Sequence, residues 1–207
     1  MPVTPFKVAF SVAAISGVGL SGYGFYYLFH RSMGDRIASS MSSKKKRFLG
    51  KGDQEWSRLK DKYNSSLNKP KKEDGISDLS FEELPEWCER NYYEGFSSDK
   101  QDTYEKVAKF CFYNTNTLLS NLSGKKFRTG GDYSDDWKQA GDAYYKYSSG
   151  NRGRDFLISA DDTYAQLSGS SSILRSLLMR KWCYDNANKK MYESGEIFPI
   201  FERWCAK

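Results

Sequence analysis

The four cysteines are the residues with the clearest chemistry in this chain. Each directly follows an aromatic residue, in the pairs Trp87-Cys88, Phe110-Cys111, Trp182-Cys183 and Trp204-Cys205. Cys88 and Cys111 are 23 positions apart, and Cys183 and Cys205 are 22 positions apart. The matching spacings favour one disulfide within each half of the chain, which would join two adjacent helices and stabilise each half by about 3 kcal/mol. Four cysteines permit three connectivities, so the choice of this pairing rests on the repeated spacing alone. The alternative is that all four cysteines are buried as reduced thiols.

Other reactive chemistry is sparse. The one histidine, His30, lies near the N-terminus, so the sequence does not predict nucleophilic catalysis by a Ser-His or Cys-His pair. A zinc site is disfavoured because there is no Cys-x-x-Cys motif and no histidine beyond residue 30. The run Ser123-Gly124-Lys125-Lys126 lacks the upstream glycine of a phosphate-binding loop. We therefore expect a non-enzymatic protein without catalytic residues, cofactor or metal.

The cysteines belong to a longer repeated pattern of amphipathic helices. Trp56, Leu59, Tyr63 and Leu67 follow one helix face, and Trp137, Ala140 and Tyr144 repeat the seven-residue spacing from Trp to Tyr. Each half then continues with a helix that ends in Trp-Cys and a helix that ends in aromatic-Cys. We interpret this as a duplicated helical unit, with repeats over 52–122 and 132–207, and predict an all-α domain over 52–207. Helices are also expected over 99–119 and 155–167.

The N-terminal region has the properties of a membrane anchor. Residues 8–29 contain no charged side chain, and as a helix these 22 residues span about 33 Å, which matches the hydrocarbon core of a bilayer. The end of this stretch is too bulky for a signal-peptidase site, so residues 1–31 are predicted to be a retained transmembrane helix. Small residues recur every fourth position, at Ala9, Ala13, Gly17 and Ser21. This stripe favours a homodimer through the helix, although small residues are common in membrane helices generally.

The positive charge is concentrated next to this segment. Of the net charge of +6, residues 1–31 carry +2 and residues 32–51 carry +5, which leaves −1 for residues 52–207. A nearly neutral domain lacks the basic face of a nucleic-acid-binding protein. Residues 32–51 are predicted to be a flexible Ser- and Lys-rich juxtamembrane linker. Its basic tract, Lys44, Lys45, Lys46 and Arg47, is expected either to contact lipid headgroups at about 1 kcal/mol per side chain or to act only as a topology signal.

The overall layout resembles the uncharacterised paralogous membrane-anchored proteins of haemotropic mycoplasmas. The resemblance rests on Trp87-Cys88, Trp182-Cys183 and the run Phe201-Glu202-Arg203-Trp204-Cys205, together with the N-terminal anchor. It implies surface display and an antigenic or host-contact role, with no assigned activity or binding residues. Paired cysteines favour an extracytoplasmic domain, whereas the basic tract favours a cytoplasmic one. We therefore expect a single-pass surface protein, with a cytoplasm-facing scaffold tethered to the membrane through its basic tract as the alternative.

Overall fold

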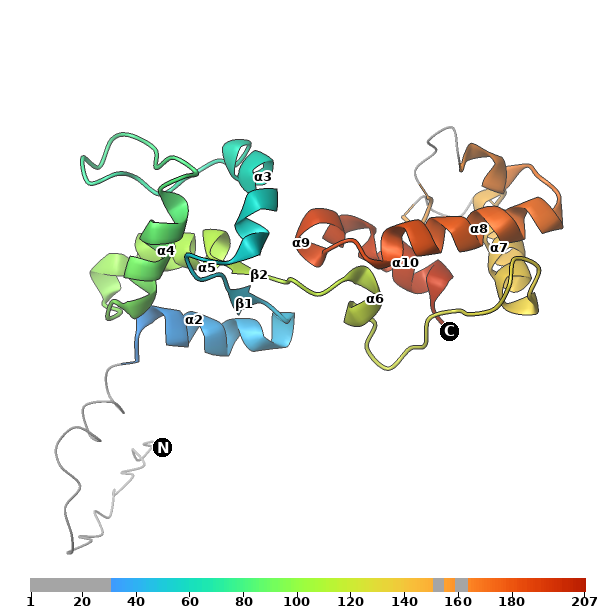
Figure 1. Cartoon of the computed structure of the whole chain (residues 1–207), viewed down its shortest axis with the longest axis horizontal. Helices are drawn as coiled ribbons and strands as arrows, with labels where there is room; N and C mark the ends of the chain where they lie inside the picture. Colours follow the sequence, from blue (N-terminus) through green and yellow to red (C-terminus); the bar gives the residue numbers. More distant parts are fainter. Residues whose placement is uncertain (1–30, 151–154, 159–163) are drawn as a thin grey trace, which may run out of the picture. The chain divides into compact units, whose positions relative to one another are not determined.

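The structure is a computed structural model of the 207-residue chain that describes residues 31–150, 155–158 and 164–207 (Figure 1). The predicted transmembrane helix and its stripe Ala9, Ala13, Gly17 and Ser21 lie outside these residues, so both remain predictions. No helix within the described ranges combines the length and the apolar character that a membrane span requires.

Helices dominate the described residues, as predicted for an all-α protein, and they fall into two halves. The first half, residues 32–113, contains α2 (Met33–Met41), η1 (Ser42–Lys44), β1 (Arg47–Phe48), η2 (Gln54–Arg58), α3 (Lys60–Asn64), α4 (Leu84–Tyr93), η3 (Ser98–Lys100), α5 (Gln101–Phe110) and β2 (Phe112–Tyr113). The second half, residues 114–207, contains α6 (Leu118–Asn121), α7 (Asp135–Ser148), η4 (Ala165–Ser168), α8 (Ser172–Ala187), α9 (Met191–Ser194), η5 (Gly195–Ile197) and α10 (Phe198–Cys205). Figure 1 colours the first half blue to green and the second half yellow to red.

Each half has its own hydrophobic core. In the first half, α2, α4 and α5 bury Met33, Leu84 and Phe110, and Tyr63 of α3 packs edge-on against the Phe110 ring. In the second half, α7 and α8 pack so closely that a Cβ atom at Gly141 would lie 2.9 Å from the backbone carbonyl carbon of Arg175. This contact requires glycine at position 141, because any larger residue would push the two helices apart.

The two halves open with the same backbone contacts. The Ser32 hydroxyl caps α2 by accepting a hydrogen bond from the backbone N–H three residues later, and the Thr117 hydroxyl caps α6 in the same way. The Met33 N–H then donates to the Glu94 carbonyl at 2.7 Å, and the Leu118 N–H donates to the Lys189 carbonyl at 2.9 Å. In both halves, therefore, the first helix is anchored to the residues that follow the Trp-Cys helix.

The two halves also close with the same contacts. Phe48 pairs with Phe112 in the antiparallel ladder between β1 and β2, and Phe127 pairs with Ala206 in an isolated antiparallel bridge. The Leu49 N–H donates to the Cys111 carbonyl at 3.0 Å, and the Arg128 N–H donates to the Cys205 carbonyl at 2.8 Å. In each half, therefore, the residue after the second cysteine pairs with a segment that follows the first helix.

A third match lies inside the Trp-Cys helices. The side-chain amide of Asn91 donates to the Trp87 carbonyl at 2.8 Å, and that of Asn186 donates to the Trp182 carbonyl at the same distance. Both asparagines are buried, at 6% and 4% exposure. The matching contacts extend over residues 32–113 and 117–207, so they begin earlier in each half than the predicted repeats 52–122 and 132–207.

Residues 32–51 are not the flexible linker that the sequence predicted. Residues 33–41 form α2, and Met33, Ile37 and Leu49 are fully buried in the first core. The prediction was based on the abundance of serine and lysine and gave too little weight to these three apolar residues, whose spacing lets them face the core. A hydrated linker would leave these side chains in water, at a cost of about 2 kcal/mol each.

Two helix predictions also need correction. The helix expected over 99–119 ends at Phe110, because the chain must straighten at Cys111 to form β2. Leu67, predicted on a buried helix face, is 80% exposed and lies beyond the end of α3. The helix expected over 155–167 is replaced within the described residues by a turn at 155–156 and by η4.

Candidate functional site

Both predicted disulfides are present, with the predicted connectivity. Cys88 and Cys111 are joined with their Cα atoms 5.6 Å apart, and Cys183 and Cys205 with theirs 5.5 Å apart. The first joins α4 to the residue after α5, and the second joins α8 to the last residue of α10. These Cα separations are typical of unstrained disulfides.

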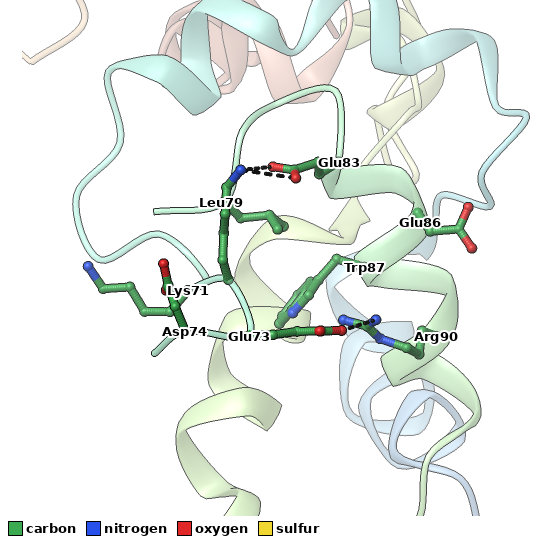
Figure 2. A pocket seen from close by; sticks show the side chains of 9 residues that line it. Lys71, Glu73, Asp74, Leu79, Glu83, Glu86, Trp87 and Arg90 are labelled. Atoms are coloured by element: carbon green, nitrogen blue, oxygen red, sulfur yellow. Dashed lines mark hydrogen bonds and ion pairs between the residues drawn. The ribbon is translucent and has the colours of Figure 1, made fainter. Parts of the chain in front are cut away.

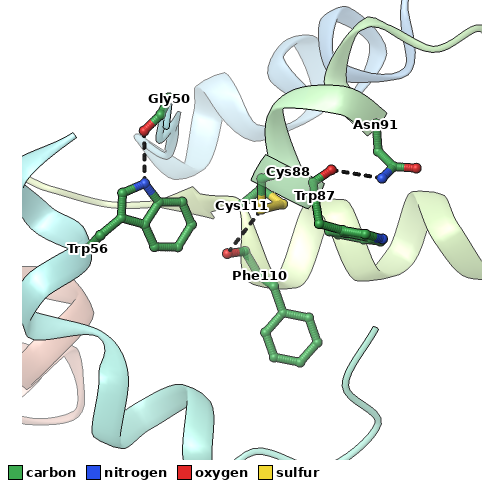
Figure 3. The surroundings of a disulfide bond; sticks show 7 residues. All are labelled: Gly50, Trp56, Trp87, Cys88, Asn91, Phe110 and Cys111. Atoms are coloured by element: carbon green, nitrogen blue, oxygen red, sulfur yellow. Dashed lines mark hydrogen bonds between the residues drawn. A yellow bond between two sulfur atoms is a disulfide. The ribbon is translucent and has the colours of Figure 1, made fainter. Parts of the chain in front are cut away.

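The disulfides are structural, because all four cysteines have no exposed surface. Figure 3 shows the first of them between α4 and the end of α5, with Trp56 on one side and Asn91 on the other. The Trp56 indole N–H donates to the Gly50 carbonyl at 2.8 Å, which ties the segment after β1 to the same core. A thiolate in solution cannot reach sulfur atoms packed in this way, so exchange requires at least local unfolding.

A hairpin-like segment, residues 70–79, forms one wall of a pocket in the first half. The Lys72 N–H donates to the Ser77 carbonyl at 2.9 Å, and the Leu79 N–H donates to the Pro70 carbonyl at 2.8 Å. At its tip, Gly75 has a φ of +69°, and the Asp74 carboxylate accepts hydrogen bonds from the backbone of the next turn. The Asp-Gly sequence suits this tip, since aspartate supports the turn and glycine tolerates positive φ.

The pocket lies between this hairpin and α4 and has a volume of about 470 Å³. Trp87 and Leu79 provide its apolar surface. Charged side chains form the rest of the lining: Lys71, Lys72, Glu73, Asp74, Glu83, Glu86 and Arg90. Figure 2 shows the Trp87 ring in the middle of the pocket, with the Glu73–Arg90 pair at one end and Glu83 at the other. Small-ligand sites are usually lined mainly by apolar side chains, so this pocket is more highly charged than most of them.

The charged groups of the pocket differ in how firmly they are held. Glu83 accepts hydrogen bonds from the Ser80 N–H and hydroxyl and forms an ion pair with Lys72 at 3.0 Å. The hydrogen bonds from Ser80 and Lys72 lower the pKa of Glu83 to about 2. The Glu73–Arg90 pair is longer, at 3.5 Å, and the Glu73 side chain is 92% exposed. Arg90 is therefore the cation of this pocket that a ligand can recruit most easily.

A cluster around Tyr192 joins the two halves. Tyr192 lies in α9 of the second half, yet it is buried in the core of the first half, where its ring packs edge-on against Tyr113. Its hydroxyl donates to Glu55, which also forms an ion pair with Lys190 at 3.3 Å. The Lys62 ammonium donates to the Tyr192 carbonyl at 2.6 Å. Burial and the hydrogen bond to Glu55 raise the pKa of Tyr192 above that of an ordinary tyrosine.

Two side chains of the basic tract are engaged by other parts of the protein. Lys45 donates to the Asn121 carbonyl at 3.1 Å and to the Ser123 hydroxyl at 2.7 Å. Arg47 forms an ion pair with Asp53 at 2.5 Å, and partial burial lowers the pKa of Lys46. Among the described residues, Lys44 has no ion pair or hydrogen-bond partner. The predicted lipid contact by Lys44, Lys45, Lys46 and Arg47 stays a prediction, but two of the four side chains already have protein partners.

The described residues contain no group of three or more His, Cys, Asp or Glu side chains arranged to hold a metal ion. Comparison of the chain with protein-family models, with curated proteins and with solved structures finds no match.

The pocket and the Tyr192 cluster were not predicted from the sequence. The Asp-Gly turn before a Trp-containing helix was a usable signal for the pocket, because it places a hairpin next to Trp87. No comparable signal marks Tyr192, whose partners lie more than 70 residues away along the chain.

Proposed function

We propose that this chain is a non-enzymatic, single-pass membrane-anchored protein whose helical region lies outside the cytoplasm and contacts a partner molecule. In this proposal the two halves are copies of one disulfide-joined unit, and residues 1–31 are the anchor. The chain would then be displayed in the manner implied by its resemblance to the membrane-anchored proteins of haemotropic mycoplasmas, in a host-contact or antigenic role.

The observation that carries the proposal is the pair of buried disulfides. Both close at matching positions, and no free cysteine is found. Structural disulfides form and persist in oxidising compartments and are rare in a reducing cytoplasm. The engagement of Lys45 and Arg47 with protein partners also weakens the alternative, a cytoplasm-facing scaffold that uses a free polybasic tract.

A reporter thiol on the surface of each half tests this topology. Leu67→Cys and Tyr133→Cys replace side chains that are 80% and 69% exposed, and the unaltered chain is the matched control because its cysteines are paired. In intact cells that express the full chain, a membrane-impermeant maleimide is expected to label both variants and not the control.

Labelling of both variants only after lysis would place the helical region in the cytoplasm and overturn the proposal. Peptide mapping of the same material under non-reducing conditions is expected to recover the linked pairs Cys88–Cys111 and Cys183–Cys205. Recovery of free thiols at all four positions would remove the observation on which the proposal rests.

A further inference from the structure

The indole N–H of Trp87 lacks a hydrogen-bond acceptor among the described residues. The indoles of Trp56 and Trp204 donate to the backbone carbonyls of Gly50 and Phe156, each at 2.8 Å. The indole N–H of Trp137 also lacks a partner in the described part of the chain, but that side chain is fully buried and lines no part of this pocket. Trp87 is only 8% exposed and lines the pocket beneath the hairpin at residues 70–79. A largely buried N–H group normally has a hydrogen-bond partner. Because no protein group that the structure describes fills this role for the Trp87 indole, the donor is free to serve a ligand or a water molecule in the pocket.

Arg90 offers further donors on the same face of α4. Residues three positions apart on a helix are neighbours, which places Arg90 beside Trp87. Its one partner among the described residues is Glu73, at 3.5 Å. An exposed pair of this length contributes little stability, and a guanidinium carries five N–H donors. Arg90 can therefore turn to an incoming acid at small cost.

Three of the four carboxylates of the pocket are already engaged, and only Glu73 is loosely held, through its pair with Arg90. Glu83 is engaged by Ser80 and Lys72, and Glu86 by Lys51. The Ser77 side chain and the Ile76 and Ser77 N–H groups lower the pKa of Asp74, and the two N–H groups donate to its carboxylate and hold it in the turn. A cationic ligand would meet only Glu73 without displacing these partners, whereas an anion meets two donor groups, the Trp87 indole and the Arg90 guanidinium.

We propose that this pocket binds a small organic carboxylate that carries an apolar group of about the size of a phenyl ring. The carboxylate accepts hydrogen bonds from the Trp87 indole and the Arg90 guanidinium, while the apolar group packs on Trp87 and Leu79. The volume of about 470 Å³ accommodates a ligand of this size. This site goes beyond the proposed function, since it does not depend on which side of the membrane the helical region faces.

The test uses the purified full chain with its disulfides intact and the indole nitrogens of its five tryptophans isotopically labelled for nuclear magnetic resonance. Trp87→Phe identifies the Trp87 signal. Phenylpropionate is titrated beside phenylpropionamide and phenylpropylamine, which keep the apolar group and change only the charge. Phenylpropionate is expected to shift the Trp87 signal saturably and to leave the Trp182 signal unmoved, while the amide and the amine bind at least several-fold more weakly.

Variants of the charged pair complete the test. Arg90→Gln is expected to weaken phenylpropionate binding about tenfold, which corresponds to one charge-assisted hydrogen bond. Glu73→Gln is expected to strengthen it, because Arg90 loses its competing partner. Arg203→Gln, which removes an exposed arginine of the second half, is the matched control and should leave binding unchanged. Unchanged Trp56 and Trp182 signals, one from the core of each half, show that each variant is folded.

Three results would overturn the proposal. Equal binding of the amide and the acid would show that the charge is not recognised. Tighter binding of the amine would make Glu73, not Arg90, the recognising group. No saturable shift with phenylpropionate at tens of millimolar would mean that the pocket does not bind such acids. None of these results bears on the topology proposal, because the measurement involves no membrane orientation.

Discussion

Removal of either disulfide should destabilise the protein by a similar amount. The closed loops span 23 and 22 positions, and for loops of this length the chain-entropy model gives about 3 kcal/mol each. For a domain of about 150–250 residues this corresponds to a decrease in melting temperature of about 6–12 °C. The equality of the two losses follows from the nearly equal loop lengths and does not depend on the amino acids around each bond.

The variants are the double replacements Cys88→Ala with Cys111→Ala, and Cys183→Ala with Cys205→Ala. Both members of a pair are changed together, because a single replacement would leave a buried thiol free to form mixed disulfides. Denaturant unfolding is followed by tryptophan fluorescence and by circular dichroism, with the unaltered chain as the reference. Because Tyr192 joins the halves, we expect the two signals to report one transition in all three proteins.

Two results would refute this reasoning. An unchanged midpoint in both variants would show that the disulfides are absent from the reference protein or do not constrain its unfolded state. Two separated transitions in the reference protein would show that the Tyr192 cluster does not couple the halves. In that case each disulfide would stabilise only the half that contains it.

Three further substitutions test other contacts. Asn91→Asp removes the donor to the Trp87 carbonyl and buries a carboxyl group, so the free energy of unfolding should fall by about 3 kcal/mol at neutral pH. Because burial raises the pKa of the new carboxyl group, urea unfolding near pH 4 should show a smaller loss. Equal losses at the two pH values would argue against a buried charge. Gly141→Ala should lower the free energy of unfolding by about 1–3 kcal/mol through its contact with the backbone of α8, whereas Gly195→Ala, with the nearest atom at 3.8 Å, should have little effect. Burial raises the pKa of Tyr63 to about 12, so above about pH 10 the folded state keeps a proton that the unfolded state loses. The free energy of unfolding should therefore fall as the pH rises from about 10 to 12. Tyr63→Phe should make this fall shallower in alkaline unfolding curves, and an unchanged slope would contradict the assignment.

The successful predictions rest on local patterns repeated along the chain. The pairing of the cysteines followed from two equal spacings, and the helical character followed from apolar residues at helical intervals. The seven-residue step from Trp56 to Tyr63 recurs from Trp137 to Tyr144, and all four side chains are buried. A repeated unit makes such signals readable, because each pattern is seen twice in different surroundings.

The failures have a common cause in contacts between distant residues. The linker prediction weighed the composition of residues 32–51, but the position of Ile37 in the core depends on α4 and α5. The helix expected to reach residue 119 stops at Phe110, because Phe112 pairs with Phe48, a residue 64 positions earlier. Propensity within a short window contains no information about either partner.

The sequence by itself determined the helical class and the repeated spacing of the two halves and predicted the two disulfide pairs, because these depend on spacing along one chain. Only the tertiary structure decided where each half begins, which lysines of the basic tract are engaged, and which tryptophan faces a pocket. Trp56 and Trp87 both look like core residues in the sequence, yet the indole of Trp56 donates to Gly50 and that of Trp87 lines the pocket with Arg90. The difference arises because the fate of a polar atom depends on which backbone carbonyls the fold brings within hydrogen-bond distance.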